Sequence, residues 1–161
     1  MDSNFLIQAH RVSYPLDVAY SFWNKVKQLA HSGLIISIDK VKDEIFDNHD
    51  LLSEWCEANL PDDFFKDTDT SIDSYRRVTS WVVSRNTHYL PNAINEFLSA
   101  EEADAFIVAY ALDNPSNNII ATQEVSEPFR RTKVKIPDAC NALGVRYVNM
   151  MDMFRMLGET F

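Results

Sequence analysis

Apolar and polar positions along the chain predict strands that alternate with helices. An apolar run rich in isoleucine occurs at 34–38, and short strand-like segments occur at 118–121 and 145–148, with a shorter extended piece at 134–136. Such runs are typical of parallel strands that are buried on both faces. Between them, apolar residues recur every three or four positions, which is typical of helices that bury one face. The order predicts an α/β fold with a mostly parallel sheet.

The helical pattern covers most of the remaining chain. It predicts helices over 15–32, 50–59, 72–85, 99–112 and 137–144, one that starts at Asp39, and a last one that is capped by Asn149 and ends before Gly158. The helix over 99–112 would start at Ser99, because Ser99 and Glu102 have the spacing of a capping box. Each of the three glycines follows a predicted helix, where a glycine is favoured as a C-cap. No glycine-rich phosphate-binding loop is present.

Length and composition suit one globular domain over residues 1–161. The chain has 161 residues, of which 46% are hydrophobic, so disorder is not expected. No apolar run reaches the roughly 18 residues of a membrane span, and the amino-terminal residues do not have the pattern of a signal peptide. Cys56 and Cys140 lie in no metal or redox motif and are expected to be reduced thiols. We expect a soluble, cytoplasmic protein without a membrane partner.

The net charge of −9 argues against general nucleic-acid binding, because phosphate backbones favour basic surfaces. The argument weakens if several of the carboxylates hold divalent cations. A local basic strip is also present, and its members are Arg130, Arg131, Lys133 and Lys135. This strip is either a phosphate contact or a solvated edge segment in which lysines deter strand pairing.

Acidic residues occur at positions that a βα chain directs toward one edge of its sheet. Glu44 and Glu124 come shortly after predicted strands, Asp2 opens the chain, and Asp104 has apolar neighbours on its helix face. Burying carboxylates near a core is costly unless they are paired or bind a cation. They are therefore candidate ligands of a hard metal ion, although Glu44 as a solvated helix residue and Glu124 as a loop residue are open alternatives. Asp138 is either a supplementary ligand or a first-turn helix charge.

Four segments, in order, resemble the motifs of PIN-domain proteins, the fold of VapC-type ribonuclease toxins, and more narrowly an uncharacterised bacterial PIN-like family. The segments are DSNFLIQAH at the start of the chain, GLIISIDKVKDEI, ADAFIVAYAL, and IIATQEVSEP with the following KVKIPDACNALGVRYVNMMDMFRML. The resemblance covers essentially the whole chain. It implies a three-layer α/β/α sandwich with a mostly parallel central sheet, whose first strand is truncated here because only Met1 precedes Asp2.

The resemblance also implies a metal-dependent endoribonuclease. Asp2, Glu44, Asp104 and Glu124 would be its catalytic carboxylates and would bind Mg²⁺ or Mn²⁺, with Asp138 as a further metal ligand. Ser3 and Thr122 match hydroxyl positions that support such a site. The expected substrate is RNA, contacted by Arg130, Arg131, Lys133 and Lys135. The expected partner is an antitoxin protein, and a homodimer is an open option.

Three other functions remain open at this point. A catalytically impaired PIN-like binding module is favoured by the truncated first strand and by Glu124, which stands where the family usually has Asp. A DNA-directed nuclease of related fold is disfavoured because the chain lacks the large insertions that such enzymes use. A haloacid-dehalogenase-type phosphatase is disfavoured because it would need Asp where Asn4 stands.

Overall fold

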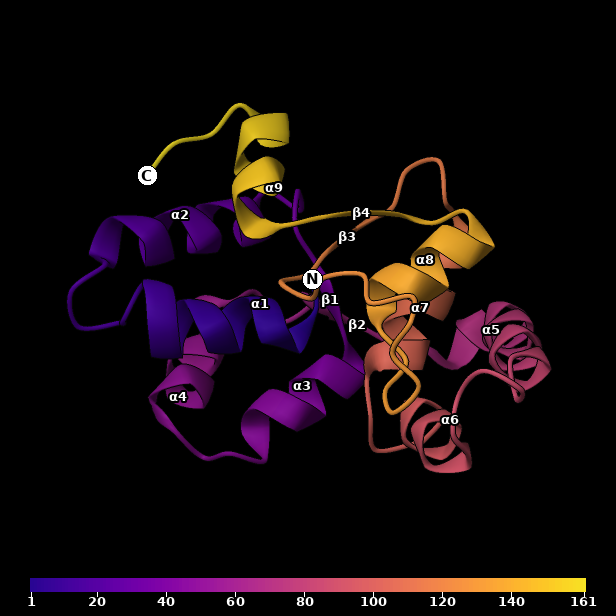
Figure 1. Ribbon diagram of the computed structural model, residues 1–161. Helices are drawn as coiled ribbons and strands as arrows, with labels where there is room; N and C mark the ends of the chain where they lie inside the picture. The colour runs from indigo at the N-terminus through magenta and orange to yellow at the C-terminus, as the bar shows by residue number, and fades with distance from the viewer.

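A computed structural model describes residues 1–161, and it shows a mixed α/β fold with short parallel strands (Figure 1). The helices are α1 (Ser3–Gln8), α2 (Tyr20–His31), α3 (Asp39–Phe46), α4 (Leu51–Asn59), α5 (Ile72–Ser84), α6 (Pro91–Phe97), α7 (Asp104–Asp113), α8 (Ile136–Leu143) and α9 (Met150–Leu157). A π-helical turn, Ala9–Ser13, and a 3₁₀ turn, Asp69–Ser71, complete the helical segments. The strands are β1 (Ser37–Ile38), β2 (Phe65–Lys66), β3 (Ile119–Ala121) and β4 (Arg146–Val148).

The strands form two separate sheets. β1 pairs with β2, and β3 pairs with β4, in both cases in parallel. Parallel pairing is as predicted, but the single central sheet expected from the sequence is divided, because β1 and β3 are not hydrogen-bonded to each other. In the view of Figure 1, α1 to α4 lie on one side of the strands, α5 to α8 lie on the other, and the amino terminus lies between them.

The ends of α8 and α9 follow from local sequence. Pro137 occupies the first turn of α8, where a missing N–H costs nothing. Gly144 and Gly158 follow the two helices with φ of 73° and 69°, a conformation that glycine adopts without steric cost. The Asn149 side chain accepts a hydrogen bond from the N–H of Asp152, 2.9 Å away, and so caps α9. These predictions are confirmed.

Other predicted boundaries are wrong. The first long helix begins at Tyr20 instead of Pro15. The capping box at Ser99 does not start a helix: the Ser99 hydroxyl accepts only the N–H of Glu101, at 3.2 Å, and α7 begins at Asp104. The strand expected over 34–38 is reduced to its last two residues. α6 and β2 were not expected from the pattern.

A single cluster of 38 buried hydrophobic residues draws on segments from Met1 to Phe154. Near the carboxyl terminus, Phe22 of α2 stacks on Tyr14 with ring centroids 4.3 Å apart and contacts Phe154 of α9 at 5.8 Å. Both cysteines are buried and unpaired, so they contribute as small apolar side chains. None of the helices combines the length and the apolar character needed to cross a bilayer.

Candidate functional site

Asp2 is a fully buried carboxylate at the amino-terminal end of α1. Its residue is 0% exposed, and its N–H donates to the carbonyl of Ala121 at 3.0 Å. The Thr122 hydroxyl donates to Asp2 Oδ2 at 2.7 Å, and the Ser3 hydroxyl lies 3.4 Å from Oδ1. Burial raises the pKa of Asp2 to about 6, while the hydrogen bond from Thr122 lowers it. The two hydroxyls predicted to support the site therefore do contact this carboxylate.

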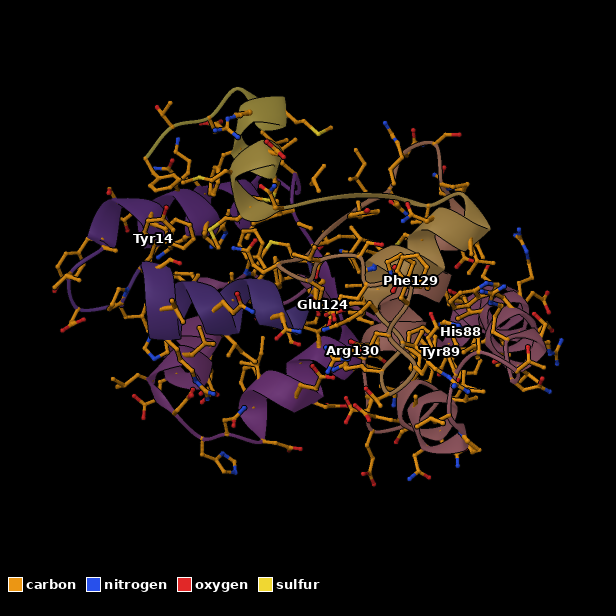
Figure 2. All side chains as sticks on the ribbon, viewed as in Figure 1. Tyr14, His88, Tyr89, Glu124, Phe129 and Arg130 are labelled. Atoms are coloured by element: carbon orange, nitrogen blue, oxygen red, sulfur yellow. The ribbon has the colours of Figure 1, made fainter.

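Glu124 lies in the segment that follows β3, near the middle of the molecule (Figure 2). Its side chain is only 5% exposed, and its Oε1 lies 2.8 Å from the ammonium of Lys135. Its other oxygen, Oε2, accepts the N–H of Ile136 at 2.9 Å, at the start of α8. Lys133 lies further away, with Nζ 4.0 Å from Oε1. Glu124 thus joins the end of β3 to α8 through partners within the protein.

Glu44 and Asp104 are connected through the start of α7. Glu44, on α3, accepts the N–H of Ala103 on its Oε1 at 2.7 Å. This N–H is one of the free donors at a helix amino terminus, so Glu44 caps α7 from a different helix. Asp104 is the first residue of α7 and is half-buried. Unlike Asp2, Glu44 and Glu124, it accepts no hydrogen bond from another residue.

The four carboxylates act on one another electrostatically. Burial raises the pKa of Asp104 well above its ordinary value, and the charges of Asp2, Glu124 and Glu44 raise it further, against a lowering effect of Lys133. The charges of Glu124 and Glu44 likewise add to the effect of burial on the pKa of Asp2. The four carboxylates therefore contribute to one region of negative charge, although the segments that carry them are distant in sequence.

The chemistry of this donor set fits a hard divalent cation, because such ions favour carboxylate oxygens and would offset the repulsion. As the side chains stand, however, no three of the histidine, cysteine, aspartate and glutamate side chains are placed to hold a metal ion together. The reason lies partly in Glu124 and Glu44, whose carboxylates are held by Lys135, Ile136 and Ala103. Asp104, with no such partner, is the carboxylate best able to accept a cation.

Asp138 is not part of this group. Its Oδ1 accepts the hydroxyl of Ser126 at 2.5 Å, and its Oδ2 accepts the N–H of Glu127 at 3.3 Å. It is buried at the start of α8 and anchors the loop that follows Glu124. In this structure its carboxylate is therefore directed to the backbone and side chain of the loop.

The four predicted RNA-binding residues differ in whether a carboxylate within the protein pairs with their charge. Arg130 pairs with Glu127 at 3.0 Å, Lys135 pairs with Glu124, and Lys133 lies 3.8 Å from Glu96. Arg131 donates from Nε to the carbonyl of His88 at 2.9 Å and has no carboxylate partner. Arg131 is thus the basic residue of the strip whose charge is available to a ligand.

Sequence reasoning missed Phe129, which lies in a turn of the loop between Glu124 and α8. Its residue is 92% exposed, and it directly precedes Arg130 in the chain (Figure 2). A phenylalanine is normally expected in a core. The adjacent basic residues were the only signal in the sequence that this loop could meet a ligand.

Comparison with known proteins identifies a family. A family described as a domain of unknown function (DUF4411) matches residues 1–161, the whole of the chain. No curated protein and no solved structure matches it.

Proposed function

The chain belongs to the DUF4411 family, and we propose that this member is an endoribonuclease that depends on a divalent metal ion and hydrolyses RNA phosphodiester bonds. The observation that carries the proposal is the convergence of Asp2, Glu44, Asp104 and Glu124, with the pKa of two of them raised by burial and by mutual repulsion. Groups with strongly shifted pKa values collect at functional sites because chemistry needs them there. The resemblance of the sequence to PIN-domain proteins supports the same reaction and a three-layer α/β/α arrangement.

In this proposal Asp104 and Asp2 are the principal ligands of Mg²⁺ or Mn²⁺, with Glu44 and Glu124 at the border of the site. Asp138 stays a weaker candidate, since it is engaged with the loop. The bound ion would supply positive charge opposite the charge that develops on the phosphodiester oxygens. In the overall reaction, water adds to phosphorus and the bond to the 3′ oxygen breaks.

The remaining residues have positioning and binding roles. Thr122 and Ser3 orient the Asp2 carboxylate through their hydroxyls. Arg131 offers a positive charge to an RNA phosphate, and Phe129 offers an aromatic face on which an unpaired base can stack. Lys133 and Lys135 would reach phosphate only by giving up contacts with Glu96 and Glu124. We further propose, from the resemblance alone, that the protein acts in the cytoplasm as the toxin of a toxin–antitoxin pair.

A second candidate is a binding module of the same fold without catalysis. It is favoured by the ion pair between Lys135 and Glu124, which supplies from within the protein the positive charge that a metal ion would bring. In that case the acidic region is structural, and the exposed loop around Phe129 contacts a protein partner. Adding a metal ion would then cause no cleavage of RNA.

The test is cleavage of a mixed-sequence single-stranded RNA in Mn²⁺, with the wild-type chain beside Asp104→Asn and Asp73→Asn. Asp73 is an exposed residue of α5 that pairs only with Arg76, so Asp73→Asn controls for the loss of one negative charge. The proposal predicts cleavage by the wild type and by Asp73→Asn, and its loss in Asp104→Asn. Equal cleavage by all three would indicate a contaminating nuclease, and no cleavage by any would favour the binding module.

A further inference from the structure

Two exposed arginines, Arg85 and Arg131, have no carboxylate partner. Arg85 directly follows α5, and Arg131 lies in the loop between Glu124 and α8. No carboxylate oxygen lies within 4.0 Å of either guanidinium. Carboxylates are not scarce in this chain, because aspartate and glutamate outnumber lysine and arginine by 24 to 15. The positive charges of these two side chains are therefore free to meet a ligand.

Hydrogen bonds hold the turn after α5 against this loop. The N–H groups of His88 and Tyr89 donate to the carbonyl of Arg85, at 2.8 and 2.9 Å, and close the turn. The N–H of Leu90 donates to the carbonyl of Arg131 at 2.9 Å. In addition, Arg131 Nε donates to the carbonyl of His88 at 2.9 Å. The backbone segments that carry the two arginines are therefore fixed side by side.

The side chain of Arg85 stays near the junction of the two segments. Tyr89, which lies at this junction, is only 4% exposed. Burial and the charge of Asp138 raise the pKa of Tyr89, and the charge of Arg85 opposes them. Because the effect of a charge falls with distance, the Arg85 guanidinium lies near Tyr89. The guanidiniums of Arg85 and Arg131 thus flank the same pair of residues, His88 and Tyr89.

A row of basic residues connects these arginines to the acidic site. Arg131, Lys133 and Lys135 alternate along the loop, and Val134, between the two lysines, is buried. Lys135 Nζ lies 2.8 Å from Oε1 of Glu124, and Lys133 Nζ lies 4.0 Å from the same oxygen. The Lys135 side chain is 14% exposed and that of Lys133 is 33% exposed. The row therefore leads outward from Glu124 to the exposed Arg131.

The groups around the two arginines define the ligand. A guanidinium binds a phosphate or a carboxylate through two parallel hydrogen bonds. Phe129, two positions before Arg131, is 92% exposed and lies on the same side of the molecule as His88 and Tyr89 in the view of Figure 2. An exposed aromatic ring can stack on an unpaired base, whereas the carboxylates of an acidic peptide offer no flat group of that kind. These features favour single-stranded RNA over an acidic peptide.

We propose that Arg85 and Arg131 form a phosphate-binding subsite for single-stranded RNA, outside the acidic site and connected to it by Lys133. The subsite rests on the proposed function, and it adds Arg85, from a different segment, to the RNA contacts. A strand that reaches both places extends from the acidic site along the basic row, so the arginines hold RNA that flanks the cleaved bond. Contacts to phosphate carry no base preference. The subsite therefore adds affinity and leaves the sequence preference unchanged.

The experiment measures binding of a labelled single-stranded RNA of about 12 nucleotides by fluorescence anisotropy, in metal-free buffer over a range of salt concentrations. Arg85→Ala should weaken binding several-fold at low salt. It should also lower the slope of log affinity against log salt by about 0.7 in magnitude, the value for one phosphate contact on a single strand. Arg85→Lys keeps the charge and should keep the slope. Arg76→Ala removes an exposed charge of α5 that pairs with Asp73, so it should match the wild type.

Equal salt slopes for Arg85→Ala and Arg76→Ala would overturn the subsite, as would an absence of RNA binding by the wild type. Polyglutamate that binds the wild type as tightly as RNA does, and binds Arg85→Ala less tightly, would assign the two arginines to an acidic peptide instead. These measurements involve neither a metal ion nor cleavage, so they are independent of the ribonuclease test. A chain that binds RNA through Arg85 without cleaving it would support the subsite and contradict the ribonuclease. Cleavage of RNA with an unchanged salt slope in Arg85→Ala would do the reverse.

Discussion

The Thr122 hydroxyl lies 2.7 Å from Oδ2 of Asp2 and donates a hydrogen bond to it, although the two residues are 120 positions apart. The same hydroxyl oxygen accepts the N–H of Glu124 at 3.1 Å. Thr122 therefore connects the carboxylate at the start of α1 to the backbone of the acidic residue after β3. Through this one side chain, the end of β3 fixes the position of two of the four acidic residues.

Replacing Thr122 by valine should raise the pKa of Asp2 further above its value of about 6, because the hydrogen bond from Thr122 lowers that pKa. The substitution also leaves the Glu124 N–H without its partner, so the free energy of unfolding should fall by about 1–3 kcal/mol. Carbon-detected NMR titration of the Asp2 carboxyl measures the first effect and urea unfolding the second. Thr122→Ser keeps the hydroxyl and should titrate like the wild type. A lower pKa in the valine variant would contradict the assigned role.

Asp2→Asn should stabilise the metal-free protein at neutral pH. Because burial raises the pKa of Asp2 from 3.8 to about 6, the ionised form is disfavoured in the folded state. The resulting loss of stability is absent well below pH 4, develops between about pH 4 and pH 6, and amounts to about 2–3 kcal/mol at pH 7. Urea unfolding in EDTA should show this gain for Asp2→Asn at pH 7 and a much smaller one at pH 4. A gain of the same size at both pH values would show that the charge of Asp2 is not its cause.

Mn²⁺ should raise the melting temperature of the wild-type chain by roughly 5 °C or more at saturation, because the cation offsets the repulsion among the carboxylates. The shift should be reversed by EDTA and should be much smaller for Asp104→Asn, since burial and three neighbouring carboxylates raise the pKa of Asp104. Differential scanning fluorimetry measures it. Asp43→Asn, at an exposed position next to Glu44 on α3, is the matched control and should keep the full shift. A shift in Asp104→Asn equal to that of the control would remove Asp104 from the metal site.

The sequence predicts this protein best where short-range chemistry decides the structure. α8 and α9 end where Gly144 and Gly158 permit a positive φ, and Asn149 caps α9 as its residue type suggests. The start of α7 could not be predicted, because its free backbone N–H is satisfied by Glu44, which is 59 positions away on α3. The capping-box pattern at Ser99 forms only a local turn.

In the candidate site, too, some features could be predicted from the sequence and others depend on contacts between distant segments. The order of the motifs predicted that the four carboxylates lie together, and in the structure the charges of neighbouring carboxylates raise the pKa of Asp2 and of Asp104. The partners that hold Glu44 and Glu124 could not be read from a pattern, since they depend on how α7 and α8 pack against the strands. The sequence also could not predict that the strands form two separate sheets, because strand pairing joins segments that are distant in sequence.

Phe129→Ala should weaken binding of single-stranded RNA on the order of ten-fold, because stacking of one base on an aromatic ring is worth about 1–3 kcal/mol. The side chain is 92% exposed, so its removal should leave the melting temperature unchanged. Arg131→Ala should weaken binding as well, and with a smaller dependence on salt, since it removes a phosphate contact. Fluorescence anisotropy of a labelled RNA, in metal-free buffer, measures both. Val125→Ala, at another exposed apolar position of the loop, is the control. Unchanged RNA affinity in Phe129→Ala would remove this loop from the proposed RNA-binding surface.

Lys135→Met should test whether the ion pair with Glu124 competes with a metal ion. The two side chains are 14% and 5% exposed, and the charged atoms lie 2.8 Å apart, so removal of the lysine leaves a buried carboxylate with a weaker counter-charge. The free energy of unfolding of Lys135→Met in EDTA should be lower than that of the wild type by about 1–3 kcal/mol. Adding Mn²⁺ should raise the melting temperature of Lys135→Met by more than it raises that of the wild type. In Lys135→Met with Glu124→Gln, stability in EDTA should recover and the extra response to Mn²⁺ should disappear. A response to Mn²⁺ that is the same in the wild type, the single variant and the double variant would show that Glu124 does not contribute to metal binding.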